Sequence, residues 1–107
     1  MAGQQASRHT LAEAQTRVRA RRLMLYGAAW LADQGRPCSV ETSMAKLFCC
    51  EGAAEVTQMC MRVTGAYGLS DQMDMERYVR DAVSLPIVGG SSNMQKNNIA
   101  NRLKLGQ

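Results

Sequence analysis

Four small residues near the C-terminal end of the sequence have the composition of an anion-binding site. Gly89 and Gly90 precede Ser91 and Ser92, after which a final helix is expected to begin. Glycines and hydroxyl residues at a helix start leave backbone N–H groups exposed, and the helix dipole adds partial positive charge. A phosphate suits this arrangement. The simpler alternative is that Ser91 or Ser92 only caps the helix after a glycine hinge.

The four cysteines and the single histidine do not form a recognisable site. Cys38, Cys49, Cys50 and Cys60 show no C-x-x-C spacing, and His9 is far from them in sequence. We therefore expect neither a metal site nor a disulfide framework. Three of them lie within a helical pattern, which is typical of small buried hydrophobic residues in a reducing compartment.

Composition and charge favour one all-α domain with an acidic ligand. The 107 residues include two prolines and five aromatic residues, and alternating β-branched runs are nearly absent. Thirteen Lys and Arg against nine Asp and Glu give a net charge of +4. A phosphate-bearing cofactor fits this charge, whereas the stacking aromatics of a nucleic-acid binder are not interleaved with it. No apolar run reaches membrane-spanning length, so we expect a soluble, cytoplasmic protein without membrane or nucleic-acid partners.

Hydrophobic spacing predicts four helices with short connections. The first runs from about Arg8 to Gly35, before Pro37; the second is capped by Ser39 and ends at Gly65; a short third follows residues 71–74; the fourth runs from about Ser92 to Leu105. We therefore predict an up-down four-helix bundle over residues 8–105 and a disordered N-terminus over residues 1–7.

Several side chains indicate how these helices pack. Residues 23–32 are apolar on nearly all sides, which places them in the middle of a bundle or under a subunit interface. Arg22 falls on the apolar face and needs a carboxylate or carbonyl partner. Gly52 and the two alanines after it allow a neighbouring helix to approach closely. Surface pairs are expected between Glu76 and Arg80 and between Arg77 and Asp81.

Five segments of the sequence match a known family in the same order. They read Arg22-Leu23-Met24-Leu25-Tyr26 with Ala28-Ala29 and Asp33-x-Gly35; Ser43-Met44-Ala45-Lys46-Leu47; Gly65-Ala66-Tyr67-Gly68; Arg77-x-x-Arg80-Asp81-Ala82; and Ile87-x-Gly89-Gly90-Ser91-Ser92-Asn93-Met94-Gln95-Lys96. Together they resemble the C-terminal helical domain of the acyl-CoA dehydrogenase family. The family's other domains and its first C-terminal helix have no counterpart, so we expect a part of a longer protein.

The resemblance implies FAD as cofactor and an oligomer. In that family FAD lies between the domains and reaches a neighbouring subunit, and the helical bundle supplies homo- or hetero-oligomer contacts. Flavin contacts are implied for Arg62, Gly65, Ala66, Ser91 and Asn93. Arg62 stands where the family has a glutamine and Ala66 where it has a second glycine, while Ser91 and Asn93 replace a threonine and a glutamate.

The resemblance also implies a reaction of fatty-acid metabolism. A carboxylate removes a proton from the α-carbon of an acyl-CoA thioester, and a hydride passes from the β-carbon to the flavin. Many members place that carboxylate where this chain has Gly89, although some carry it on an earlier helix. We therefore assign no catalytic residue and expect the chain alone to be inactive. The N–H of Gly89 is still suited to polarise the thioester carbonyl of the substrate.

Two other functions are consistent with the sequence. The chain is alternatively a non-catalytic helical assembly subunit that buries residues 23–32 against a partner, with the base supplied by that partner or absent. Gly89 and Asn93 favour this alternative over catalysis. A third hypothesis is phosphate contact with nucleic acid through the arginines of the first helix, although such arginines usually form a solvated face; these are Arg17, Arg19, Arg21 and Arg22.

Overall fold

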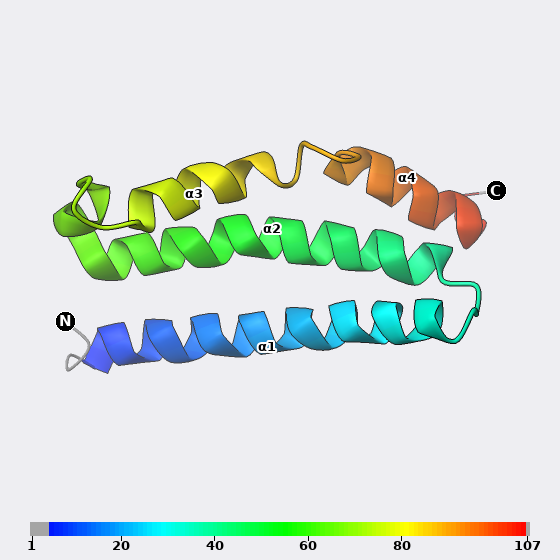
Figure 1. Cartoon of the computed structure of the whole chain (residues 1–107), viewed down its shortest axis with the longest axis horizontal. Helices are drawn as coiled ribbons and strands as arrows, with labels where there is room; N and C mark the ends of the chain where they lie inside the picture. The colour runs from blue at the N-terminus through cyan, green and yellow to red at the C-terminus, as the bar shows by residue number, and fades with distance from the viewer. Residues whose placement is uncertain (1–4, 107) are drawn as a thin grey trace.

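The computed structural model describes residues 5–106, and it confirms an all-α fold with no strand in this part of the chain. The helices are α1 (Gln5–Asp33), α2 (Ser39–Thr64), α3 (Met75–Ser84) and α4 (Ser92–Arg102), with a short 3-10 helix, η1 (Gly65–Leu69), after α2 (Figure 1). Across the described residues, no helix combines the length and the apolar character that crossing a bilayer requires.

α1 begins slightly earlier than predicted and ends near the predicted point. Its first described residue is Gln5 rather than Arg8, and its last is Asp33. Gly35 follows with φ of +67°, which glycine adopts without strain, and its N–H donates to the carbonyl of Ala32 at 3.0 Å. Residues 5–7 are therefore helical, while the rest of the segment expected to be disordered lies outside the described residues.

α2 ends as predicted but begins differently. Gly65 is its C-terminal cap, with φ of +65°, and donates its N–H to the carbonyl of Met61. The prediction that Ser39 caps the helix was wrong, because Ser39 is already its first residue and Cys38 occupies the cap position. Cys38 makes no side-chain capping bond. The hydroxyl of Thr42 instead donates back to the carbonyl of Cys38 at 2.9 Å, so it satisfies no N–H of the first turn.

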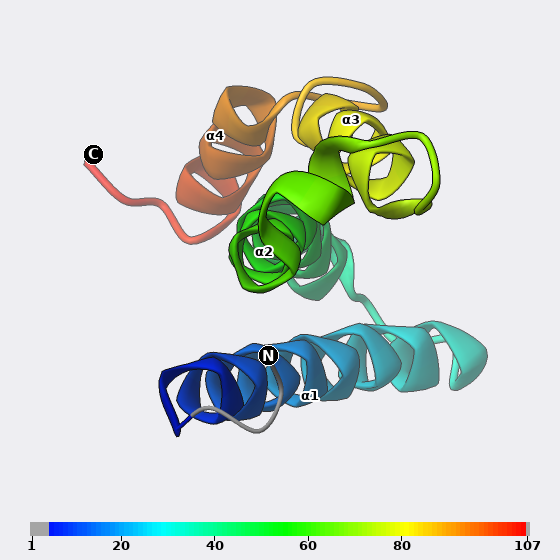
Figure 2. The same ribbon diagram turned by 90° about the vertical axis from the view of Figure 1, so that its left-hand side faces the viewer.

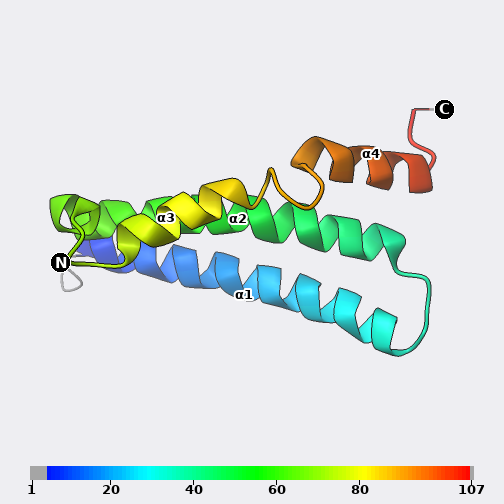
Figure 3. The ribbon, with the colours of Figure 1, turned by 45° about the horizontal axis from the view of Figure 1, so that its top comes forward.

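α2 is the middle layer of the molecule. α1 lies antiparallel to it on one side, and α3 and α4 lie on the other (Figures 1 and 2). Among the described elements, α1 contacts only α2, and α3 does not contact α4. Because α4 continues in the direction of α3 (Figure 3), the four helices form three layers, the third broken at residues 85–91. The molecule measures 48 × 27 × 23 Å.

The layers meet through small side chains. The buried apolar residues are Ala14, Ala28, Ala45 and Ala82, and no large side chain among residues 5–106 is fully buried. In the segment predicted to lie inside a bundle or under an interface, Leu23 is 67% exposed, Tyr26 62% and Trp30 55%. Within this chain these three side chains therefore lie on the outer side of α1, whereas Ala28 of the same segment is buried on the side that packs on α2.

Candidate functional site

The Gly89–Ser92 segment is an exposed loop that leads into α4. Gly89 has φ of +65° and Gly90 of +93°, conformations in which a side chain is strained. A Cβ at Gly90 would also lie 2.6 Å from Nε2 of Gln95, whereas one at Gly89 would meet open space. Both glycines are exposed and Ser91 is half-buried. The start of α4 is therefore open to solvent rather than enclosed in the protein's core.

Ser91 is the N-cap of α4, as the simpler interpretation predicted. Its backbone is extended, with φ of −62° and ψ of 163°, and its Oγ accepts a hydrogen bond from the N–H of Met94 at 3.3 Å. This capping hydrogen bond leaves other backbone N–H groups of the loop without an acceptor. Among residues 5–106, the N–H groups of Gly89, Gly90 and Ser91 donate to no protein acceptor. Capping and anion binding are thus compatible, because they use different groups.

The other predicted flavin contacts lie at the far end of α2. Arg62 is exposed in its last turn, and Gly65 and Ala66 are exposed in the 3-10 turn that follows. Arg62 lines a cavity of about 480 Å³ between the end of α2 and the first turns of α1, which carry Thr10 and Arg17.

The six predicted site residues therefore form two groups. Ser92 contacts Glu51 of α2, and Gly65 follows 14 residues later, which corresponds to roughly 20 Å at 1.5 Å per helical residue. Gly89, Ser91 and Asn93 belong to the first group, and Arg62, Gly65 and Ala66 to the second. In Figure 1 the connection between α3 and α4 lies over the middle of α2, away from the C-terminal end of α2.

Three polar residues that the sequence did not single out for the site hold the first group in place. The ammonium of Lys46 donates to the carbonyls of Leu85, at 2.6 Å, and Val88, at 2.8 Å. The Oγ of Ser92 donates to Oε1 of Glu51 at 2.5 Å. Gln95, which is only 8% exposed, donates from Nε2 to the carbonyl of Gly90 at 3.4 Å. Their partners are about forty residues away or across a turn, so sequence spacing gave no signal for Lys46 or Glu51.

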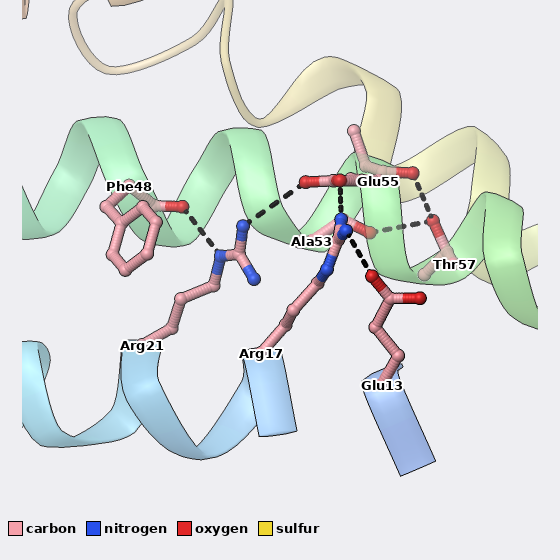
Figure 4. Close-up of polar contacts among 8 residues, drawn as sticks. Glu13, Arg17, Arg21, Phe48, Ala53, Glu55 and Thr57 are labelled. Carbon is pink, nitrogen blue, oxygen red and sulfur yellow. Dashed lines mark hydrogen bonds and ion pairs between the residues drawn. The ribbon is translucent and has the colours of Figure 1, made fainter. Parts of the chain in front are cut away.

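A charged cluster joins α1 to α2, but it contains Arg21 rather than the predicted Arg22 (Figure 4). Arg21 is 12% exposed; its Nε donates to the carbonyl of Phe48 at 3.1 Å and its Nη2 to Oε2 of Glu55 at 3.3 Å. Arg22 is exposed. Neighbouring residues differ by about 100° around a helix, so a small error in the phase of the apolar face selects the wrong arginine.

Glu55 also pairs with Arg17, which in turn pairs with Glu13 at 2.7 Å. Two of the four arginines proposed to contact nucleic acid are therefore engaged within the protein. Of the predicted surface pairs in α3, Glu76 with Arg80 is confirmed at 2.7 Å. The other was wrong: Arg77 pairs with Asp74 of the preceding turn, at 3.5 Å, because that carboxylate lies within reach on the same side of the helix.

The cysteines are free and half-buried. In the described part of the chain, no three His, Cys, Asp or Glu residues are grouped to hold a metal ion. Burial raises the pKa of the Cys49 thiol; the neighbouring Cys50 raises that pKa further and Arg21 opposes the rise. Cys49 is therefore a protonated packing residue at neutral pH rather than a nucleophile.

Comparison with known proteins identifies this arrangement. The family model of the acyl-CoA dehydrogenase C-terminal domain matches residues 1–104. The chain belongs to the acyl-CoA dehydrogenase family. It is 40% identical over 96 residues to the mitochondrial short/branched chain specific acyl-CoA dehydrogenase of Bos taurus, covering 90% of this chain and 22% of that protein.

Solved structures share the fold of this chain. Butyryl-CoA dehydrogenase from Megasphaera elsdenii matches with a TM-score of 0.92 at 27% identity, over 96% of this chain and 27% of that one. The FAD complex of PigA matches with a TM-score of 0.92 at 25% identity, over 99% of this chain and 28% of that one. Acyl-CoA dehydrogenases are FAD-dependent oxidoreductases, and this chain spans about a quarter of the length of these relatives. What it corresponds to is their C-terminal helical domain.

Proposed function

We propose that this chain is the FAD-contacting and oligomerising domain of an acyl-CoA dehydrogenase-like flavoprotein, in which the Gly89–Ser91 loop rests against the cofactor's phosphates. The observation that carries the proposal is the row of N–H groups at Gly89, Gly90 and Ser91, which have no acceptor among residues 5–106. Such groups at the positive end of a helix dipole are suited to an anion. Asn93, exposed in the first turn of α4, adds a neutral donor beside them.

The second group supplies a different kind of contact. The guanidinium of Arg62 is exposed and carries charged donors in a fixed fork, which suits a phosphate better than the amide that the family has there. Gly65 and Ala66 place exposed backbone next to it. FAD has a single diphosphate, and the two groups lie roughly 20 Å apart along α2, so the loop takes the phosphates of one FAD and Arg62 those of a second FAD held by a neighbouring subunit.

The chain's part in the reaction on an acyl-CoA thioester is binding rather than proton transfer. Gly89 has no side chain to accept a proton, and the carboxylate that contacts the loop, Glu51, already accepts a hydrogen bond from the hydroxyl of Ser92. The N–H of Gly89 is available to polarise the thioester carbonyl, a role that needs no side chain. The base is then supplied outside residues 5–106.

Nuclear magnetic resonance titration of the 107-residue chain tests the cofactor contact. FAD and ADP should shift the amide signals of Gly89, Gly90 and Ser91, whereas riboflavin, which has no phosphate, should leave them in place. If FAD at millimolar concentration moves none of these signals, the proposal is wrong.

One pair of variants isolates the N–H groups. Ser91 has φ of −62°, which proline also adopts, so Ser91→Pro removes the N–H and the capping hydroxyl together while keeping the native φ of this residue. Ser91→Ala removes the hydroxyl alone. Because a hydrogen bond to a charged group contributes about 1.5–3 kcal/mol, Ser91→Pro should bind ADP at least about tenfold more weakly than Ser91→Ala. Equal affinities of the two variants for ADP would show that the N–H of Ser91 does not contribute to binding and that only the capping hydroxyl matters.

A second candidate function, a non-catalytic assembly subunit, is favoured by the outer face of α1. Leu23, Tyr26 and Trp30 recur there at helical spacing with more than half of each side chain exposed. Sedimentation equilibrium should show an oligomer that Tyr26→Glu dissociates, while Tyr78→Glu, at a tyrosine of α3 that is 50% exposed, leaves it intact. Emission of Trp30, the single tryptophan, should shift to the red on dissociation. A monomer at high protein concentration would exclude this function.

A further inference from the structure

The loop that carries the free N–H groups is attached at both of its ends to α2. Before the glycines, the ammonium of Lys46 donates to the carbonyls of Leu85 and Val88 at 2.6 and 2.8 Å. After them, the hydroxyl of Ser92 donates to Glu51 at 2.5 Å. The stretch between these attachments is Gly89, Gly90 and Ser91, whose N–H groups have no acceptor in the described part of the chain.

The attachment by Lys46 has a clear physical basis. Leu85 is the C-terminal cap of α3, so its carbonyl belongs to the end of a helix where carbonyls lack partners and the dipole is negative. A cation there satisfies these carbonyls and is favoured by the dipole. Lys46 is half-buried, and it therefore fixes the point at which the chain leaves α3.

The loop needs such attachments because of its composition. Two consecutive glycines are the least restricted residues of the unfolded chain, and ordering each backbone position is unfavourable in entropy. A loop that is ordered only when a ligand arrives loses that entropy on binding, whereas a loop already held in shape does not. The N–H of Ser92, bonded to the carbonyl of Pro86 at 2.9 Å, closes the same loop from within.

We propose that Lys46 and Glu51 of α2 are positioning residues, which hold the Gly89–Ser91 loop in its anion-binding shape before the ligand arrives. The proposal rests on the proposed function, since it concerns the same loop. Neither side chain touches the ligand. Both act through the loop carbonyls and the Ser92 hydroxyl, and they act from one helix, five residues apart.

The opposite charges of the two residues make the proposal separable from simple electrostatics. If charge alone mattered, Lys46→Met would weaken binding of ADP and Glu51→Ala, which removes a negative charge, would strengthen it. If the residues position the loop, both variants weaken binding, each by about tenfold, because each releases one end of the loop. Glu51→Ala is thus the deciding variant.

The experiment measures amide hydrogen exchange and order parameters of Gly89 and Gly90 in the free chain, together with ADP affinity by the same titration. Lys46→Met and Glu51→Ala should raise exchange and mobility at both glycines and weaken ADP binding, and Lys46→Arg should restore most of both. Lys104→Met, the same substitution beyond α4, is the matched control and should change neither. Circular dichroism should show unchanged helix content in every variant.

The outcomes separate this inference from the proposed function. Wild-type binding of ADP with tighter or unchanged binding by Glu51→Ala overturns the positioning role and leaves the cofactor contact standing. A second outcome is that the wild type binds no ADP, while Gly89 and Gly90 become more mobile in the variants. This result overturns the cofactor contact and leaves Lys46 and Glu51 as residues that only hold the loop. Glycines that stay equally ordered in both variants overturn the positioning role directly.

Discussion

The two sides of α2 hold their neighbours by different means. On one side, α1 approaches closely over Ala14, Ala28 and Gly52, and the guanidinium of Arg21 lies across the contact. On the other side, α3 and α4 are joined by a loop whose carbonyls and hydroxyl are bound by Lys46 and Glu51. The first side fixes the distance between two rigid helices, whereas the second fixes the shape of a flexible segment. Substitutions on the first side should therefore change global stability most, and those on the second should change local order and ligand binding most.

The largest expected effect is at Gly52. A Cβ at this position would overlap the guanidinium end of Arg21, which is held by Phe48 and Glu55. Gly52→Ala should lower the free energy of unfolding by about 2 kcal/mol, since the displaced arginine loses charged hydrogen bonds that outweigh the gain of about 1 kcal/mol in helix propensity.

Urea denaturation followed by circular dichroism measures this difference. The matched control is Gly27→Ala in α1, where a Cβ meets nothing within 4 Å, and it should stabilise the protein slightly. Adding Arg21→Ala to Gly52→Ala should cost little more than Gly52→Ala alone, because the clash is then gone. Equal effects of the two glycine substitutions would show that α1 does not depend on this close approach.

The next effect is on the other side, at the two loop glycines. Gly90→Ala combines φ of +93° with a Cβ 2.6 Å from Gln95, so it should lower the free energy of unfolding by about 1–2 kcal/mol. Gly89→Ala has the backbone penalty alone and should cost about 1 kcal/mol. Thermal unfolding of the two variants compares them, and a larger cost at Gly89 would contradict the role of Gln95 beneath the loop.

A smaller effect distinguishes the two carboxylates beside α1. Glu55 bridges Arg17 and the mostly buried Arg21, whereas Glu13 pairs only with Arg17 within one helix. Glu55→Gln should therefore cost about 1 kcal/mol of unfolding free energy and Glu13→Gln less than about 0.5 kcal/mol. The cost of each substitution should be smaller at high salt, because salt screens the ion pairs that it removes. Equal costs at low salt would show that the ion pair with Arg21 contributes no more to stability than the pair between Glu13 and Arg17.

The smallest effect is a pH dependence from Cys49. Its folded pKa lies above the ordinary value of 9.0, through burial and the neighbouring Cys50. The unfolded thiol then loses its proton first, so the contribution of Cys49 to stability is full below about pH 9 and declines as the pH rises further. The free energy of unfolding measured from pH 8 to pH 10 should fall more steeply in the wild type than in Cys49→Ala. Parallel curves would show that the thiol is not shielded.

The sequence predicted the features that local chemistry determines. Helix ends at Gly35 and Gly65 followed from glycine's left-handed conformation, and the cap at Ser91 followed from a hydroxyl before a helix. The family was predicted from five short segments in the same order, and the match of the family model to residues 1–104 confirms it.

The features that depend on contacts between distant segments were missed. Lys46 reaches carbonyls 39 and 42 residues away, and no spacing in the sequence connects them. The choice of Arg21 over Arg22 depends on the rotation of α1 against α2, which the apolar pattern defines only to within about one residue. The flavin and substrate contacts predicted for the glycine loop and the end of α2 stay predictions.

Among the described elements, α1 contacts only α2, and α3 and α4 do not contact each other, so α2 and the η1 turn that continues it join the layers. A structural change at the outer face of α1 reaches the glycine loop only if α2 rotates or shifts as a rigid helix, moving Lys46 and Glu51 with it. Any signal between an attached subunit and the loop would travel along one helix, and the amides at the centre of that helix should be the last in the molecule to exchange with solvent.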